Sequence, residues 1–186
     1  MDLKGSWPYI ESVARSRLSH NKTERHIDTY GEGIEVIGAA GEIIVRRFLG
    51  LPEQVHDHFD HGIDLEYYGL TVDVKATILT PNAPYRYLQW PNWKKLRADI
   101  VVMTAIDPLN RLGTVIGYAR KDEILRAPLN PNRPTPCREI PFPHLHPAWE
   151  LVVEGCYRQT QAALGFRPSR SRKRRGGSPA LKPSGA

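Results

Sequence analysis

The segment that decides the fold is Gly62-Ile63-Asp64-Leu65-Glu66-Tyr67-Tyr68-Gly69-Leu70-Thr71-Val72-Asp73-Val74-Lys75-Ala76-Thr77. Apolar and polar residues alternate on both sides of Tyr68-Gly69, which is typical of a β-hairpin with a two-residue turn. In that register Leu65 faces Val72, and Asp64 faces Asp73. Opposed residues have Cβ atoms about 4.5–5.5 Å apart, so the two carboxylates repel each other unless a cation compensates.

One face of the predicted hairpin gathers polar groups that suit phosphate chemistry. Asp73 and Lys75 are two residues apart on one strand, so they share a face with Asp64. The residues between them and beside them point into a core: Val72, Val74 and Ala76. Carboxylate oxygens suit Mg²⁺ or Mn²⁺, and such an ion can activate water and stabilise charge on a phosphate. The lysine can orient or deprotonate that water, or stabilise the transition state.

An amphipathic helix is predicted before the hairpin, from about Ile34 to Leu49. Its apolar face consists of Ile34, Ile37, Gly41, Ile44, Val45 and Phe48. Gly38 and Gly41 have no side chains and allow this face to approach a sheet closely. Glu42 projects about 100° from the centre of the face, at its rim, where its carboxylate could join the cluster without being buried. Pairing with Arg46 at the i+4 position is the alternative for this glutamate.

The rest of the chain supplies further helices and strands. A first helix follows Ser6 and runs through Leu18, and His20 to Gly33 is expected to be a loop. Further predicted elements are a short strand around Tyr85–Gln89, strands at Asp99–Ala105 and Leu112–Ala119, and a short helix at Lys121–Arg126. Seven prolines between Pro128 and Pro147 predict an irregular segment. A last helix is predicted with Trp149, Val152, Val153, Cys156 and Leu164 on one face. This order indicates an α/β (α+β) domain with a mixed sheet.

Charge is distributed unevenly along the 186 residues. The net charge is +6, but residues 166–186 contain seven Lys or Arg and no acid, which leaves the remainder at −1. The composition predicts a domain at residues 1–165 and a disordered basic tail at 166–186. A basic tail on a nearly neutral body points to a polyanionic partner, most simply nucleic acid.

Neither secretion nor membrane insertion is indicated. The N-terminus lacks the apolar run of a signal peptide, and no apolar stretch is long enough to span a bilayer. The two cysteines, Cys137 and Cys156, do not suggest a disulfide framework. We therefore expect a cytoplasmic protein, in a bacterial or phage-infected cell, with no membrane partner.

Gly62-Ile63-Asp64, followed after eight residues by Asp73-Val74-Lys75, resembles the core motif of the PD-(D/E)XK nuclease superfamily. Asp64 matches the first acid, Asp73 the second and Lys75 the lysine. Glu42 resembles the helix glutamate of many members, and the main-chain carbonyl at the position of Val74 often joins their metal site. The resemblance covers about residues 34–119. Ile63 departs from it, because it stands where the motif's name has proline.

The resemblance implies a restriction-endonuclease-like mixed β-sheet core flanked by helices. It also implies a metal-dependent nuclease that hydrolyses DNA phosphodiester bonds, with endonuclease action expected and RNA not excluded. The implied catalytic residues are Asp64, Asp73, Lys75 and Glu42, and the implied ligands of Mg²⁺ (or Mn²⁺) are Asp64, Asp73, Val74 and Glu42. Many members act as dimers on duplex DNA, so a homodimer is one assembly that the resemblance allows.

Two further segments could contact nucleic acid. Aromatic and basic residues interleave between residues 85 and 95, where they could stack on bases and bind phosphates: Tyr85, Arg86, Tyr87, Lys94 and Lys95. The tail could attract phosphates through Arg170, Arg172, Lys173, Arg174 and Arg175. The alternatives are that the aromatics belong to a core and that the cations are simply solvated, or that the tail is a localisation signal.

Two other functions compete with a nuclease. His56-Asp57-His58-Phe59-Asp60-His61 resembles the zinc signature of the metallo-β-lactamase superfamily, which implies a zinc hydrolase. A helical half precedes this signature here, the chain is short for that fold, and His144 and His146 form no recognisable partner motif. The second alternative is a noncatalytic nucleic-acid-binding protein on a nuclease fold.

Overall fold

The chain is a mixed α+β structure, seen here in a computed structural model that describes residues 1–25, 31–55, 62–79 and 86–165. The helices of this part are α1 (Trp7–Arg25), α2 (Glu32–Phe48), α3 (Lys121–Arg126), α4 (Trp149–Ala163) and a 3-10 turn at Phe142–His144. The strands are β1 (Leu65–Tyr67), β2 (Leu70–Ile78), β3 (Tyr87–Pro91), β4 (Ile100–Asp107), β5 (Leu112–Arg120), β6 (Leu129–Asn130) and β7 (Cys137–Pro141). Across these residues, no helix combines the length and apolarity needed to cross a membrane.

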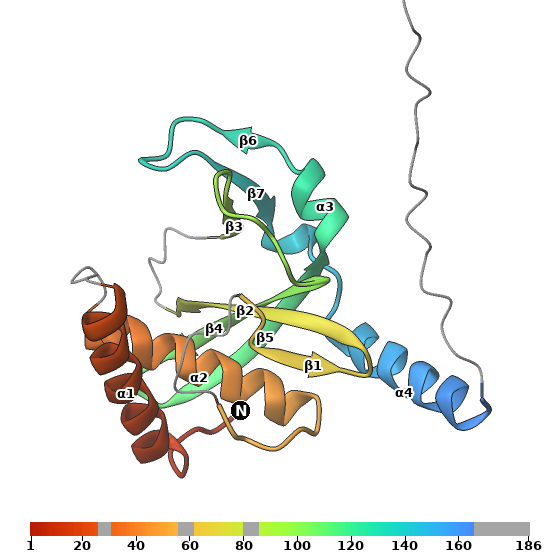
Figure 1. Cartoon of the computed structure of the whole chain (residues 1–186), viewed down its shortest axis with the longest axis horizontal. Coiled ribbons are helices and arrows are strands. Elements are labelled where there is room, and N and C mark those ends of the chain that lie inside the picture. The colour runs from red at the N-terminus through yellow and green to blue at the C-terminus, as the bar shows by residue number, and fades with distance from the viewer. Residues whose placement is uncertain (26–30, 56–61, 80–85, 166–186) are drawn as a thin grey trace, which may run out of the picture.

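Two sheets form the body of the molecule. The larger sheet has the order β1-β2-β4-β5, with β2 and β4 parallel and the other pairs antiparallel, so the predicted mixed sheet is confirmed. Figure 1 shows α1 and α2 against one face of this sheet, and the small sheet β3-β7-β6 with α3 on the opposite side. Buried apolar side chains fill both interfaces.

The hairpin forms with the predicted turn and register. Tyr68 and Gly69 both have positive φ, 45° and 79°, as a tight two-residue turn requires, and Leu65 pairs with Val72. β2 continues to Ile78, well past the end of β1, and no described strand pairs with its outer edge beyond Val72. This part of β2, which carries Asp73 and Lys75, therefore forms an edge of the sheet.

α2 packs closely on β2 because Gly41 has no side chain. A Cβ at this position would lie 2.8 Å from Thr104 Oγ1 and 2.9 Å from the Ala76 Cβ, closer than side chains tolerate. At Gly38 a Cβ would meet nothing within 4 Å, so only one of the two glycines permits the close approach. Ile34, assigned to the apolar face, is largely exposed, whereas Ile37, Ile44 and Val45 are buried as predicted.

The expected loop at residues 20–33 is wrong at both ends. α1 continues to Arg25 and α2 already begins at Glu32, with Gly31 as its N-cap. The end of α1 contains Lys22, Glu24 and Arg25, which are good helix formers, and polar composition alone does not exclude a helix. Residues 26–30 lie outside the described part of the chain.

The proline-rich segment contains regular structure, contrary to the expectation of an irregular one. β7 lies between β3 and β6. Its residue Arg138 pairs with both neighbouring strands, whereas Glu139 and Ile140 pair with β3 alone. The prolines of this sheet, Pro91 and Pro141, stand at the last positions of their strands. Proline is tolerated there because little of the hydrogen-bond ladder is lost.

The predicted inner face of α4 is wrong for four of its five residues. Trp149, Val153, Cys156 and Leu164 are exposed, Val152 is partly buried against the core as predicted, and the buried residues are Leu151 and Gly155. A Cβ at Gly155 would lie 2.3 Å from the Tyr67 hydroxyl, so the helix rests on β1 through this glycine. The helix carries apolar residues on two sides, and periodicity did not reveal which side packs.

Candidate active site

Asp73 is a fully buried carboxylate at the edge of the large sheet, with 0% of its surface exposed. Its Oδ1 accepts a hydrogen bond from the Lys75 ammonium. Its Oδ2 is buried and has no hydrogen-bond partner in the described part of the chain. Burying an ionised oxygen without a partner is costly, so this atom is suited to a cation or a bound polar ligand.

Asp64 flanks Asp73 from the end of β1. The β1–β2 ladder stops at Leu65, so Asp64 does not pair directly with Asp73 as the ideal register predicts. Instead the Asp64 N–H donates to the Val72 carbonyl at 2.8 Å, and the Val74 N–H donates to Asp64 Oδ2. These two bonds attach Asp64 to the residues before and after Asp73 on β2, so Asp64 lies beside Asp73 along the strand edge. Asp64 is thus attached to the residue that follows Asp73, through a backbone arrangement that differs from the predicted direct pairing of the two acids.

The same bonds indicate where the Val74 carbonyl points. In a strand, the N–H and C=O of one residue are directed to the same side. The Val74 N–H is directed to Asp64, whereas the Lys75 carbonyl accepts from Thr104 Oγ1 on β4 at 3.2 Å. The Val74 carbonyl is therefore directed to the outer edge of β2, the side on which Asp64 lies.

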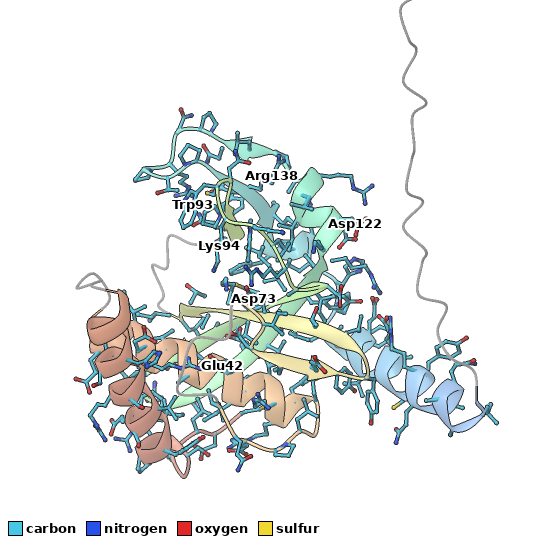
Figure 2. All side chains as sticks on the ribbon, in the orientation of Figure 1. Glu42, Asp73, Trp93, Lys94, Asp122 and Arg138 are labelled. Atoms are coloured by element: carbon cyan, nitrogen blue, oxygen red, sulfur yellow. The ribbon has the colours of Figure 1, made fainter. Side chains whose placement is uncertain are left out.

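Lys75 connects the acids to the small sheet. Its side chain is 32% exposed, and its Nζ lies 5.4 Å from the ring centroid of Trp90. The Lys94 Nζ lies 5.2 Å from the same ring, and the Trp90 indole N–H donates to the Lys94 carbonyl at 2.8 Å. A buried indole thus has two ammonium groups against its ring, an arrangement that cation–π attraction stabilises. Figure 2 shows Lys94 on the small-sheet side of Asp73 and Glu42 on the helix side.

Glu42 is buried, contrary to the expectation that it sits at an exposed rim. Its side chain is 6% exposed, and its two oxygens accept from Arg17 on α1 at 2.7 and 3.0 Å. The alternative partner, Arg46, instead donates to the Asp64 carbonyl at 3.0 Å. α1 covers this flank of α2 and removes the carboxylate from water, which helical periodicity within α2 alone did not reveal.

The charge of Arg17 is coupled to the candidate site. Burial acts to lower the pKa of Arg17, but the hydrogen bond from its side chain to Glu42 and the negative charges of Glu42, Asp64 and Glu35 raise that pKa above its ordinary value. The guanidinium therefore stays charged. Its coupling to both Glu42 and Asp64 places a fixed positive charge beside the acids.

A cavity of about 1200 Å³ borders the site along the open edge of β2. β2 contributes residues 74–78 to its lining, including Lys75, and β3 contributes Tyr87 and Gln89. The opposite wall comes from α1 and the start of α2 and includes Glu11 and Glu32. Lys75 is thus accessible from this cavity while Asp73 remains buried next to it.

The predicted ligands fit a hard divalent cation that needs few protein contacts. Among the described residues, no group of three His, Cys, Asp or Glu side chains is arranged to hold a metal ion. Asp64, Asp73 and the Val74 carbonyl nevertheless lie at neighbouring positions along the outer edge of β2. Mg²⁺ commonly uses one or two carboxylates and keeps several waters, so it does not require a group of three such side chains.

The predicted nucleic-acid contacts are only partly within the described residues. Arg86, Tyr87 and Lys95 are exposed, and Lys94 is half-buried against Trp90. Tyr85 and the tail cations Arg170, Arg172, Lys173, Arg174 and Arg175 lie outside the described residues. Of the two tryptophans in this segment, Trp90 is a core residue and Trp93 is exposed.

The candidate zinc segment, His56 to His61, also lies outside the described residues. Of the two histidines considered as its partners, His144 is exposed. His146 stacks on Tyr118, and its Nε2 lies 2.7 Å from Glu123 Oε1. His146 thus takes part in an interaction that joins α3 to the segment before α4.

Sequence reasoning missed Arg17 and the role of Trp90. Arg17 had a readable signal, since it continues the apolar face formed by Ile10, Val13 and Ala14 on α1. A charged residue on such a face indicates a buried ion pair. Trp90 had no such signal, because its contact with Lys75 joins two sheets whose packing the sequence does not show.

Comparison with known proteins adds no relatives to this description. No protein-family model, no curated protein and no solved structure matches the chain.

Proposed function

We propose that this protein is a metal-dependent nuclease that hydrolyses phosphodiester bonds in DNA, acting as an endonuclease. The observation that carries the proposal is the Asp73 carboxylate. It is fully buried, has an unpartnered Oδ2 in the described part of the chain, contacts Lys75 and is flanked by Asp64. A purely structural acid at a strand edge would be solvated or fully paired, whereas a hydrolytic site needs this combination.

Asp64, Asp73 and the Val74 carbonyl would hold Mg²⁺ or Mn²⁺. When bound, the ion supplies positive charge that favours ionisation of water and stabilises the negative charge developing on the phosphate. The two aspartates supply the hard oxygens, and the bond from the Val74 N–H to Asp64 fixes the direction of one of them. The arrangement requires no further protein carboxylate, which agrees with the pairing of Glu42 to Arg17.

Lys75 would orient the attacking water and stabilise the phosphate. Its contact with Asp73 and the Trp90 ring holds the ammonium in one place, and its partial exposure leaves it accessible from the cavity. A fixed cation beside the reacting phosphorus stabilises the transition state without reorganisation. Lys75 is thus assigned a catalytic role.

Glu42 and Arg17 would act as a charged pair behind the acids. Both Glu42 oxygens already accept from Arg17, so Glu42 would influence the ion through water and not by direct contact. The Arg17 guanidinium offsets part of the repulsion among the neighbouring carboxylates. Glu42 is therefore assigned a positioning role.

The test is cleavage of supercoiled circular, linear duplex and single-stranded DNA, and of RNA, with Mg²⁺, Mn²⁺, Zn²⁺ or EDTA. Wild type is compared with Lys75→Met and with Lys4→Met, a matched loss of an exposed lysine that no described interaction ties to the site. We expect cleavage with Mg²⁺ or Mn²⁺ that is lost in Lys75→Met and kept in Lys4→Met. Cleavage of the closed circle would show endonuclease action.

Two results would overturn the proposal. Full activity in Lys75→Met would remove the assigned site. Binding without cleavage of any substrate, with every ion, would favour the noncatalytic nucleic-acid-binding alternative.

A further inference from the structure

Trp93 is a large, solvent-exposed aromatic side chain on a turn that hydrogen bonds hold in place. It is 77% exposed, in contrast to the buried Trp90 three residues earlier. Its turn is closed by a hydrogen bond from the Lys94 N–H to the Pro91 carbonyl at 3.0 Å. The Asn92 N–H donates to the Pro136 carbonyl at 3.0 Å, and the Trp90 indole N–H donates to the Lys94 carbonyl. A contact made by Trp93 would therefore cost little backbone entropy.

The stretch of chain that carries Trp93 is basic. Between residues 76 and 98 there are four cations and no acid: Arg86, Lys94, Lys95 and Arg97. Across the open edge of β2 the helix wall carries Glu11 and Glu32, and the Glu32 carboxylate lies 3.9 Å from the Arg15 guanidinium. A phosphate backbone approaching Lys75 is therefore attracted more strongly to the small-sheet side than to the helix side.

The turn that carries Trp93 is connected to the candidate active site through the Trp90 ring. Lys94, adjacent to Trp93, and Lys75 both lie against the ring of Trp90. Figure 2 shows Trp93 and Lys94 on the same side of Asp73. A nucleotide held at Trp93 would therefore be a near neighbour of a phosphate held at Lys75.

We propose that Trp93 stacks on an unpaired base of the DNA substrate, which makes gapped or single-stranded DNA the preferred ligand over blunt duplex. The inference rests on the proposed function for the position of the cleaved phosphate. An exposed indole can cover a base only where the base has lost a stacking neighbour, as at a gap or an overhang. Lys94 and Lys95 bind the phosphates on either side of that nucleotide.

The test measures binding, so that it does not depend on cleavage. Fluorescence anisotropy in EDTA gives the affinities of the full-length protein for a blunt duplex and for the same duplex with a short single-stranded gap. The variants are Trp93→Ala, Trp93→Phe and the control Trp149→Ala, which removes another exposed tryptophan, on α4. Trp93 is exposed, so its replacement should leave folding intact.

We expect wild type to prefer the gapped duplex by at least about fivefold, the lower range for stacking on one base. Trp93→Ala should lose that preference and keep its affinity for blunt duplex, Trp93→Phe should retain part of it, and Trp149→Ala should match wild type. Equal binding of both duplexes by wild type, or an unchanged preference in Trp93→Ala, would overturn the inference. A Trp93-dependent preference in a protein that cleaves no DNA would sustain the stacking site and refute the nuclease.

Discussion

Replacing Arg17 with Met should strongly destabilise the protein, because it leaves Glu42 charged, buried and without its main partner. The two side chains are 13% and 6% exposed, and the guanidinium contacts both carboxylate oxygens. Removing one member of such a buried pair typically costs about 3–5 kcal/mol. We expect a loss near the lower end, about 3 kcal/mol, since a small part of Arg17 still reaches water.

The double variant Arg17→Met/Glu42→Met tests whether the loss of stability in Arg17→Met comes from the unpaired buried charge of Glu42. Two apolar side chains of similar length remove both charges together, so the double variant should lie within about 1 kcal/mol of wild type. The free energies of unfolding of wild type, Arg17→Met, Glu42→Met and the double variant are measured by urea unfolding followed by circular dichroism. With a slope of about 2 kcal/mol per M, Arg17→Met should lower the urea midpoint by about 1.5 M. A single variant within about 0.5 kcal/mol of wild type, or a double variant as unstable as the sum of the singles, would refute the reasoning.

Two further predictions concern packing and pH. Gly41→Val should destabilise the protein by about 1–3 kcal/mol, because its Cβ would collide with Thr104 Oγ1, whereas Gly38→Ala should be neutral or stabilising; similar melting temperatures for both variants would contradict the packing of α2. Burial acts to raise the pKa of Glu139, but hydrogen bonds led by that from Asn130 hold it below the ordinary value of 4.5. The stability that the ionised Glu139 carboxylate contributes is present above about pH 4.5 and is lost as the pH falls through its lower folded-state pKa. Glu139→Gln should therefore lose less stability than wild type between pH 7 and pH 3. Identical pH profiles in urea unfolding would count against this assignment.

The hairpin could be predicted in detail because each of its features is local. The turn at Tyr68-Gly69 fixes the register, and alternation along β2 assigns Asp73 and Lys75 to one face. Sequence spacing thus sufficed to place Lys75 beside Asp73, whose carboxylate it contacts. Even here, the precise backbone at Asp64 followed from hydrogen bonds that an ideal ladder does not contain.

Features that depend on packing between distant elements were beyond the sequence. The burial of Glu42 requires α1 to lie across α2, and the contact of Lys75 with Trp90 requires the small sheet to cover the large one. The inner face of α4 was misassigned because Trp149 and Val153 are as apolar as Leu151, and the choice between the two sides depends on the close approach of Gly155 to Tyr67. A short strand near β3 was predicted, but β6 and β7 of the small sheet were missed because prolines obscured short strands that are stabilised by pairing with one another.

The central claim is that Asp73 supports metal-dependent cleavage of DNA. The most direct measurement is the single-turnover cleavage rate of wild type and Asp73→Asn over a Mg²⁺ titration, with matching circular dichroism to show that both are folded. We predict that the wild-type rate is zero in EDTA, rises with Mg²⁺ and saturates, while Asp73→Asn shows no cleavage at any concentration. Cleavage by Asp73→Asn at the wild-type rate, or wild-type cleavage that persists in EDTA, would contradict the account.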